Sequence, residues 1–219
     1  MTEDLLPGVE TSEAVRRAVV ELAAVAQTGL HYATDPFDRA RYEQVARVAE
    51  ELRTLVTQVP TGGLPPLVAP DGGHVTPKVD VRGAVFDADG RILLVRERTD
   101  GGWTPPGGWC DPLEPPGSSV LREVHEEAGV EARILRLAAV LDRDVRGHLP
   151  RMPVTVYKLF FVCEPLALGE GTRDAAEILD VGWFPMDALP PLSLSRILPE
   201  ELAICHAAWA DPSLPTAFD

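Results

Sequence analysis

The stretch Trp103–Val130, WTPPGGWCDPLEPPGSSVLREVHEEAGV, carries the densest chemistry in this chain of 219 residues. It joins a double glycine to four glutamates. Glu114 stands alone in a loop rich in Pro and Gly, whereas Glu123, Glu126 and Glu127 follow at the helical spacing i, i+3, i+4. These three side chains therefore project from one face of a predicted helix. Because like charges four residues apart destabilise a helix, the pattern predicts a cation bound between them.

The donor types indicate which cation this is. Clustered carboxylate oxygens with few nitrogen or sulfur atoms nearby suit a hard divalent ion, Mg2+ or Mn2+, which also binds phosphate oxygens. The three cysteines are widely spaced and form no metal-ligand pattern, so we interpret them as free thiols in a reducing compartment. They are Cys110, Cys163 and Cys205.

Composition limits the function classes. Hydrophobic residues make up 45 % of the chain and charged residues 25 %, which predicts a globular protein. The formal net charge of −14 argues against a protein that holds nucleic acid by neutralising phosphates, and an anionic substrate would need metal ions to offset the repulsion. The first residues show no signal-peptide pattern and no apolar run is long enough for a membrane span, so we expect a cytoplasmic protein.

Two helices are predicted near the N-terminus. The first runs from Ser12 to about Gln27 and ends at Gly29. The second starts at Pro36 behind an Asp35 cap and ends before Pro60. Apolar residues recur at helical spacing in both helices, at Val15, Val19, Leu22 and Ala23 and at Tyr42, Val45, Val48, Leu52 and Val56.

These helices predict an N-terminal helical hairpin module over residues 1–59. Its apolar face is too large to be left bare, so we expect it to serve partly for homodimerisation; the alternative is a hairpin that only covers its own catalytic domain. Residues 60–77, rich in Pro and Gly and without periodicity, are predicted to be a linker.

The rest of the chain, residues 78–219, predicts an α/β fold. The turn Asp89-Gly90 predicts that the two strands around it pair as a β-hairpin. A closing helix is predicted over Pro199–Trp209. Strands on both sides of the acidic helix favour a mixed sheet covered by helices on its faces. The predicted strands are Val79–Phe86, Arg91–Arg96, Arg133–Asp142, Val154–Cys163 and Ile178–Phe184.

The acidic stretch resembles a known family. Read as Gly108, five residues, Glu114, seven residues and then REVHEEAGV from Arg122, it is similar to the signature of the Nudix hydrolases at every defined position. The resemblance implies an α/β/α sandwich with a mixed sheet for residues 78–219. It also implies metal-dependent hydrolysis of the pyrophosphate bond in a nucleoside diphosphate linked to another group, X.

The resemblance further implies roles for residues of the signature. Glu126 and Glu127 would be ligands of the metal, and the backbone carbonyl of Gly107 an additional ligand. Glu123 would be a ligand or the base that activates the attacking water. Arg122 would hold a glutamate in place or contact a phosphate, and both interpretations stay open.

Members of the family often use a further acid from a later loop. Glu177 is our candidate catalytic acid of this kind, with Glu164 and Asp174 as alternatives. His148 and Arg151 lie in a polar segment between predicted strands and are candidates for binding the base or the leaving group. The alternative is that His148 is an ordinary surface or core histidine, and that Arg151, like Lys158, lies on a solvated face.

Trp103 and Trp109 flank the glycine loop, so that one of them could stack on a base, whereas core packing is the other interpretation. Four further stretches extend the resemblance over nearly the whole chain: LAAVAQTGLHYATDPFDRARYEQVARVAEEL, VTPKVDVRGAVF, WTPPGGW and YKLFFVCE. Together they resemble a bacterial Nudix subgroup that carries an N-terminal helical module and acts on nucleoside diphosphates linked to X. The resemblance makes CDP-choline, split to CMP and phosphocholine, the first substrate to test. ADP-ribose is the alternative substrate, and a non-catalytic nucleotide-binding module is the alternative of another class.

Overall fold

The computed structural model describes residues 7–57, 74–111, 113–152, 154–168 and 176–219. The chain divides into two compact units, Met1–Pro77 and Lys78–Asp219. Most of the predicted linker, residues 60–73, lies outside the described residues. Among the helices that the structure describes, none combines the length and the apolar character needed to cross a membrane.

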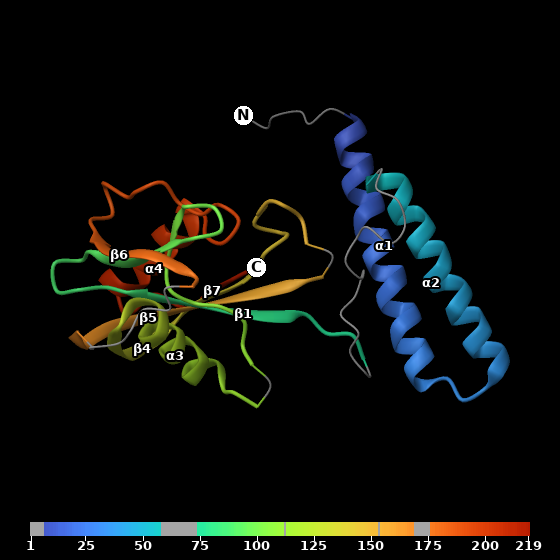
Figure 1. Cartoon of the computed structure of the whole chain (residues 1–219), viewed down its shortest axis with the longest axis horizontal. Helices are drawn as coiled ribbons and strands as arrows, with labels where there is room; N and C mark the ends of the chain where they lie inside the picture. Colours follow the sequence, from blue (N-terminus) through green and yellow to red (C-terminus); the bar gives the residue numbers. More distant parts are fainter. Residues whose placement is uncertain (1–6, 58–73, 112, 153, 169–175) are drawn as a thin grey trace. The chain divides into compact units, whose positions relative to one another are not determined.

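The first unit contains helices α1 (Pro7–Tyr32) and α2 (Pro36–Thr57), which run side by side (Figure 1). The predicted start of the second helix is confirmed. Asp35 Oδ1 accepts hydrogen bonds from the backbone N–H groups of Phe37 at 2.9 Å and Asp38 at 3.1 Å. These bonds satisfy donors that the first turn of a helix leaves without intrahelical partners.

The predicted end of the first helix is wrong. Gly29 lies inside α1, not beyond it. A Cβ atom at Gly29 would stand 2.3 Å from the ring of Tyr42, so glycine is required there for the close packing of Tyr42 against α1. A glycine selected for close packing looks the same in a sequence as a glycine that ends a helix.

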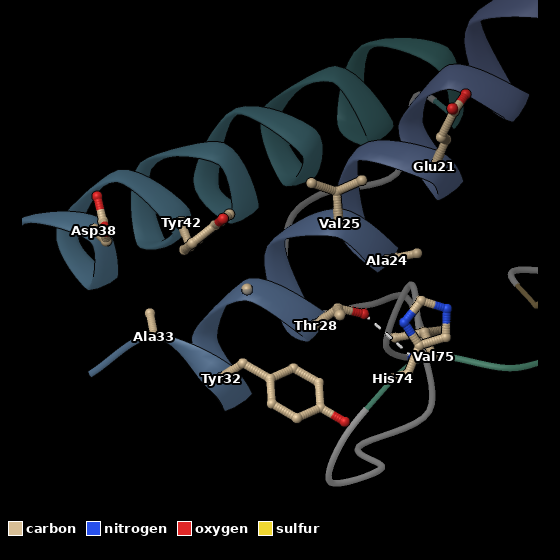
Figure 2. A pocket seen from close by; sticks show the side chains of 11 residues that line it. Glu21, Ala24, Val25, Thr28, Tyr32, Ala33, Asp38, Tyr42, His74 and Val75 are labelled. Atoms are coloured by element: carbon tan, nitrogen blue, oxygen red, sulfur yellow. Dashed lines mark hydrogen bonds between the residues drawn. The ribbon is translucent and has the colours of Figure 1, made fainter. Parts of the chain in front are cut away.

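A pocket of about 560 Å³ opens within this unit, and its lining residues are drawn in Figure 2. Tyr32 and Tyr42 contribute rings to its wall, and Val25 contributes a half-exposed side chain. Thr28 Oγ1 accepts a hydrogen bond of 3.2 Å from the backbone N–H of Val75, which ties the end of this unit to α1.

The second unit contains two sheets. One has four strands in the order β1-β5-β4-β7, and it is mixed, because β1 and β7 run parallel to their neighbours while β4 and β5 are antiparallel. The other has three antiparallel strands in the order β3-β2-β6. The strands are β1 (Lys78–Val85), β2 (Ile92–Glu97), β3 (Trp103–Thr104), β4 (Val130–Asp142), β5 (Val156–Leu168), β6 (Ile178–Phe184) and β7 (Ala217–Phe218).

The predicted hairpin between the first two strands is wrong. β1 pairs in parallel with β5 along its whole length, and β2 belongs to the other sheet. Only a single bridge, Phe86 to Ile92, joins the two strands at the turn. Both strands are buried on both faces, so each can pack between layers without using its sequence neighbour as a partner.

Helices α3 (Pro116–Ala128) and α4 (Pro199–Ala210) cover opposite faces of these strands (Figure 1). Two apolar clusters separate the layers, and alternate residues of β1 and β2 belong to different clusters. Leu202 and Cys205 of α4 pack with Phe86 in one cluster, whereas Val124 of α3 packs with Val85 in the other. This arrangement confirms the predicted α/β fold with helices on both sides of mixed strands.

The remaining boundaries differ by a few residues. The predicted strand over Ile178–Phe184 and the start of the closing helix at Pro199 are confirmed. The fourth strand begins earlier than predicted, at Val130, directly after Gly129 ends α3 in a left-handed conformation with φ 65°. The short strands β3 and β7 carry no sequence pattern long enough to predict them.

Candidate active site

The glycine loop lies against β1 as an additional extended segment. The backbone N–H of Val81 donates to Gly108 O and that of Gly83 donates to Pro106 O, both at 2.8 Å. Gly107 lies between these two bonds with φ +151°, and a Cβ atom there would stand 2.0 Å from Val81 O. The loop can therefore approach β1 this closely only with glycine at residue 107.

Glu127 of α3 faces this loop. Its Oε2 accepts a hydrogen bond of 2.9 Å from the backbone N–H of Gly107. The side chain is buried, and burial raises the pKa of Glu127 to about 8, although Arg82 and the Gly107 N–H act in the opposite direction. A carboxylate in these surroundings has less positive charge around it than its ionised form needs.

Arg122 connects the other acids of the signature. It holds Glu114 through two bonds of 3.0 and 3.1 Å, Glu126 at 2.9 Å and Glu123 at 3.1 Å. Burial raises the pKa of Glu123, and Arg122 only partly offsets the effect. Gly108 allows Glu123 to approach the loop, since a Cβ at residue 108 would stand 2.9 Å from Glu123 Oε1.

A cavity of about 700 Å³ joins these groups to the sheet. It brings together six of the nine residues predicted for the site: Gly107, Trp109, Arg122, Glu123, Glu127 and Glu177. The other three, Glu126, His148 and Arg151, are not among the residues that line it. The competing acid Glu164 pairs with Arg133 at the surface, and Asp174 lies outside the described residues.

The floor of the cavity carries a buried charged cluster that sequence reasoning missed. Asp80 of β1 accepts hydrogen bonds from Arg82 at 2.8 Å and from Lys158 of β5 at 2.6 Å, and all three residues line the cavity. Burial alone would raise the pKa of Asp80, but the two cations outweigh it and hold the pKa at about 2. Charged residues at alternate positions of an apolar strand were the signal that could have found this cluster.

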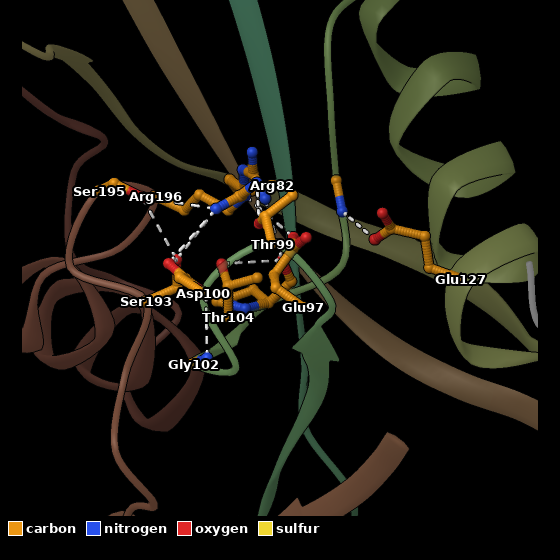
Figure 3. A network of polar contacts seen from close by, with 12 residues as sticks. Arg82, Glu97, Thr99, Asp100, Gly102, Thr104, Glu127, Ser193, Ser195 and Arg196 are labelled. Carbon is orange, nitrogen blue, oxygen red and sulfur yellow. Dashed lines mark hydrogen bonds and ion pairs between the residues drawn. The ribbon is translucent and has the colours of Figure 1, made fainter. Parts of the chain in front are cut away.

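A second polar network closes the opposite wall (Figure 3). Arg196 contacts Glu97 at 3.0 Å, Asp100 at 3.5 Å and Thr99 at 2.9 Å, and it thereby joins the segment after β2 to the segment before α4. Glu97 lines the cavity, and burial raises its pKa although Arg196 opposes the shift. The sequence analysis did not single out Glu97, because it lies one residue beyond a predicted strand in a run of mixed charges.

His148 connects the segment after β4 to residues near the start of α4. Its side chain is fully buried, with Nε2 at 2.8 Å from Glu201 Oε1 and Nδ1 at 3.2 Å from Leu194 O. Glu201 in turn accepts a hydrogen bond of 2.9 Å from the backbone N–H of Leu198 at the start of α4. Both nitrogens of His148 are engaged within the protein, which matches the core alternative of the sequence analysis.

Trp103 and Trp109 also differ in their surroundings. Trp103 packs edge-on against Phe184, with ring centroids 4.7 Å apart, at the margin of the core. Trp109 is half exposed at the cavity and is bridged to Asp80 of β1. Of the two tryptophans, Trp109 is therefore the one that a ligand in the cavity can contact.

The donors around Glu127 fit a hard divalent ion in type. Carboxylate oxygens of Glu123 and Glu127 face the glycine loop. Burial raises the pKa of each, so a bound cation would stabilise their ionised forms. Within the described ranges, no three His, Cys, Asp or Glu side chains already converge as a metal-binding group. Glu126 pairs with Arg122 and does not line the cavity.

Comparison with known proteins identifies the family. The NUDIX domain profile matches residues 76–203, and a profile described as "UDP-X-like, N-terminal oligomerisation domain" matches residues 13–64. The chain belongs to the Nudix family. This match, together with hydrolase relatives that align over nearly the whole chain, identifies it as a Nudix pyrophosphohydrolase.

One relative is "Putative ADP-ribose pyrophosphatase YjhB" of Bacillus subtilis (strain 168), which is 37 % identical over 198 residues, 90 % of this chain and 93 % of the relative. A solved ADP-ribose pyrophosphatase from Streptococcus suis 89-1591 is 40 % identical, with a TM-score of 0.58, and covers 66 % of this chain and 100 % of that one. A solved UDP-X diphosphatase is 27 % identical, with a TM-score of 0.59, and covers 95 % of this chain and 99 % of that one.

Proposed function

We propose that this protein uses Mg2+ or Mn2+ to hydrolyse the pyrophosphate bond of a nucleoside diphosphate linked to X. The observation that carries the proposal is the meeting of Glu123, Glu127 and the Gly107 loop in one cavity with the cations Arg82 and Lys158. Acids that can bind a metal and cations that can contact phosphates are both needed for this chemistry.

The roles proposed for these residues are those that the family resemblance implies. Glu123, Glu126, Glu127 and the carbonyl of Gly107 would hold the divalent ion; Gly107 lies between two residues whose carbonyls bond to β1. When bound, the ion offsets phosphate charge and lowers the pKa of the attacking water. Arg122 positions the glutamates of the signature, which it already contacts.

A further acid is needed if Glu123 serves only as a ligand. Glu177 lines the cavity from the segment before β6 and is the catalytic acid proposed here. Glu97 lines the same cavity, but Arg196 holds it at 3.0 Å. The freedom of a loop side chain to approach a substrate favours Glu177 over Glu97.

The substrate proposal keeps two candidates. CDP-choline rests on the resemblance to the subgroup with the N-terminal helical module. ADP-ribose is favoured by the names of the Bacillus subtilis and Streptococcus suis relatives. Trp109 is the proposed stacking residue, whereas Arg151 and His148 stay proposals for substrate binding that the lining of the cavity does not support.

We place the helical module at residues 1–59, the linker at 60–77 and the hydrolase domain at 78–219. The oligomerisation profile over residues 13–64 supports a homodimer formed through the helical module. Val48 and Leu55 of α2 are exposed by 42 % and 76 % and, seven residues apart, lie on one helix face. A second copy would cover this apolar face.

The proposal is tested by initial rates on CDP-choline and ADP-ribose side by side, with Mg2+, with Mn2+ and with excess chelator. We expect hydrolysis with either ion and none with the chelator. CMP as the main product would support the subgroup assignment, and AMP would support ADP-ribose. Tight nucleotide binding without turnover of any nucleoside diphosphate derivative would instead favour a non-catalytic Nudix-fold binding module.

A further inference from the structure

The strand order determines how the charged residues of the cavity follow one another, from α3 across β1 and β5 to the end of β4. The acids of α3 face β1, Asp80 and Arg82 lie on β1, and Lys158 lies on the neighbouring β5 in register with Asp80. β4 follows β5, and Arg143 comes directly after the end of β4. Arg143 therefore lies about two strand spacings from β1, roughly 10 Å. This span is comparable with the distance from a phosphate to the far edge of the base within one nucleotide.

Arg143 is fixed in place by its surroundings. Its backbone N–H donates to Val156 O at 3.0 Å, and its Nη2 donates to Ser195 O at 3.2 Å. Its carbonyl accepts a bond of 3.3 Å from the backbone N–H of His148, whose side chain is locked against Leu194 and Glu201. The backbone of Arg143 is thus held on both sides and its guanidinium at Nη2, which preorganises the side chain for a ligand.

One donor of this guanidinium is left over. Arg143 is only 5 % exposed, it lines the cavity, and its buried Nη1 has no hydrogen-bond partner. The other four cations of the cavity lining each pair with a carboxylate: Arg82 and Lys158 with Asp80, Arg122 with Glu114, and Arg196 with Glu97. Among the described residues no ion pair to Arg143 is found, although the carboxylates of Asp144, Asp80 and Glu201 act favourably on its charge. Its Nη1 donor therefore remains to be satisfied.

The surroundings of Arg143 are partly apolar. Val156, whose carbonyl accepts the Arg143 backbone bond, lines the cavity together with Pro150 and Met152, and these three side chains carry no charge; Ser195, which accepts from Nη2, lines it as well. Building on the proposed function, we infer that Arg143 is a specificity-determining residue, which donates a hydrogen bond from Nη1 to a carbonyl oxygen of a pyrimidine base. The base would lie against Pro150, Met152 and Val156, at the end of the cavity away from the metal-binding acids.

Charge and shape favour the base over the X group at this end. A cationic X such as choline would be repelled by Arg143, and a sugar would find few polar partners on the three apolar side chains. A planar base with a carbonyl at its edge suits both these side chains and the single donor. Because cytosine and uracil carry such an oxygen and adenine does not, Arg143 favours pyrimidine nucleotides over adenine nucleotides.

The first test uses the wild-type protein and substrates that differ only in the base. We expect kcat/KM with Mg2+ to be higher for UDP-glucose than for ADP-glucose. Analogues of UDP-glucose with sulfur in place of the O2 or the O4 oxygen identify the atom that Arg143 contacts, and one of them should lose about 10- to 100-fold, the effect of a missing hydrogen bond to a charged group. Equal rates for both analogues and the parent would overturn the inference.

The second test uses Arg143→Gln and Arg143→Lys, with Arg133→Gln as the matched control. Arg133 lies on β4, the strand that Arg143 follows, is exposed and pairs with Glu164 outside the cavity. We expect both Arg143 variants to lower the UDP-glucose to ADP-glucose ratio of kcat/KM about 10-fold or more, mainly through KM, and the control to keep it. A uniform loss for both substrates would overturn the assignment and indicate a structural role.

Further experiments distinguish contact with the base from contact with X, and failure of this inference from failure of the proposed function. UDP-glucose and UDP-glucuronic acid share a base and differ in X; a loss in Arg143→Gln confined to one of them would move the contact to X and overturn the inference. Thermal unfolding of each variant detects misfolding, and the analogue series on the wild type does not depend on the variants. If the wild type turned over no nucleoside diphosphate derivative, the proposed function would fail, and the binding of UMP against AMP by calorimetry would still test Arg143.

Discussion

Glu127 shows how one buried carboxylate serves the proposed chemistry at a cost to the fold. It accepts one backbone hydrogen bond, from Gly107, and its pKa of about 8 means that the neutral form is favoured in the protein without metal. Ionising it near neutral pH requires a cation. The residue is therefore better suited to binding a divalent ion than to stabilising the helix.

Glu127→Gln tests this role. We expect kcat/KM with Mg2+ to fall roughly 100-fold or more, since even outer partners of metal sites contribute 10- to 100-fold. The melting temperature without metal should stay nearly level, because Glu127 is already mainly neutral and glutamine keeps an oxygen that can accept from the Gly107 N–H. Glu131→Gln, at an exposed glutamate just after α3, is the control and should change neither quantity. Full turnover in Glu127→Gln would refute the assigned role.

Asp80 differs from Glu127 in that its surroundings favour the ionised carboxylate. Its pKa of about 2, against an ordinary value of 3.8, means that the ionised form is stabilised in the folded protein. This contribution, about 2 kcal/mol, is present above pH 4 and is lost as the pH falls through 2. Without Asp80, the buried charges of Arg82 and Lys158 would have no partner.

We therefore expect Asp80→Asn to lower the free energy of unfolding at pH 6 by about 3–5 kcal/mol, as when one partner of a buried ion pair is removed. The gap between wild type and variant should be smaller by about 1 kcal/mol at pH 3. Urea unfolding at both pH values measures it, with Asp89→Asn as an exposed control. A gap that does not change with pH would contradict the ion-pair account.

At the same scale, the sequence predicted the acids of the signature and failed on the residues that face them. Six of the nine predicted residues line the cavity, because the helical spacing of the signature fixes which side chains share a face. Asp80 and Arg143 were missed, since their proximity depends on the pairing of β1, β5 and β4, which adjacent residues do not encode. Glu97 was missed because it ends β2, a strand of the other sheet.

At the scale of elements, the glycine loop matters most. Its alternating bonds to β1 set the distance between the strand and the acids of α3, and Gly107 allows that distance. The sequence analysis predicted the strand that became β2, not the glycine loop, beside β1. A turn signal such as Asp89-Gly90 predicts a reversal of the chain, while the partner of each strand is decided by burial on both faces.

We therefore expect Gly107→Ala to lower both stability and activity strongly. The added Cβ would meet Val81 O at 2.0 Å, so the loop must separate from β1, and we expect a loss of more than about 2 kcal/mol in the free energy of unfolding and of most activity. Gly147→Ala is the control: this residue also has a positive φ, +86°, but open space around it. It should cost only about 1–2 kcal/mol of backbone strain. Equal effects of the two substitutions would contradict the close-approach account.

At the scale of the whole molecule, the proposed dimer depends on the helical module. The exposed apolar residues Val48 and Leu55 should lie in the interface. We expect light scattering to give the mass of a dimer for the wild type and of a monomer for the double substitution Val48→Glu, Leu55→Glu. The control, Leu166→Glu, changes an equally exposed apolar residue of β5 and should leave the mass unchanged. A monomeric wild type at micromolar concentration would remove the dimer proposal.

The central claim is metal-dependent hydrolysis of the pyrophosphate bond, and mass analysis of the products in ¹⁸O-labelled water tests it most directly. With Mg2+ and either CDP-choline or ADP-ribose, the account predicts a nucleoside monophosphate and a phosphorylated X, with one ¹⁸O atom on one of the two phosphates. Excess chelator should abolish both products. Absence of a labelled monophosphate from every nucleoside diphosphate derivative, with Mg2+ and with Mn2+, would contradict it.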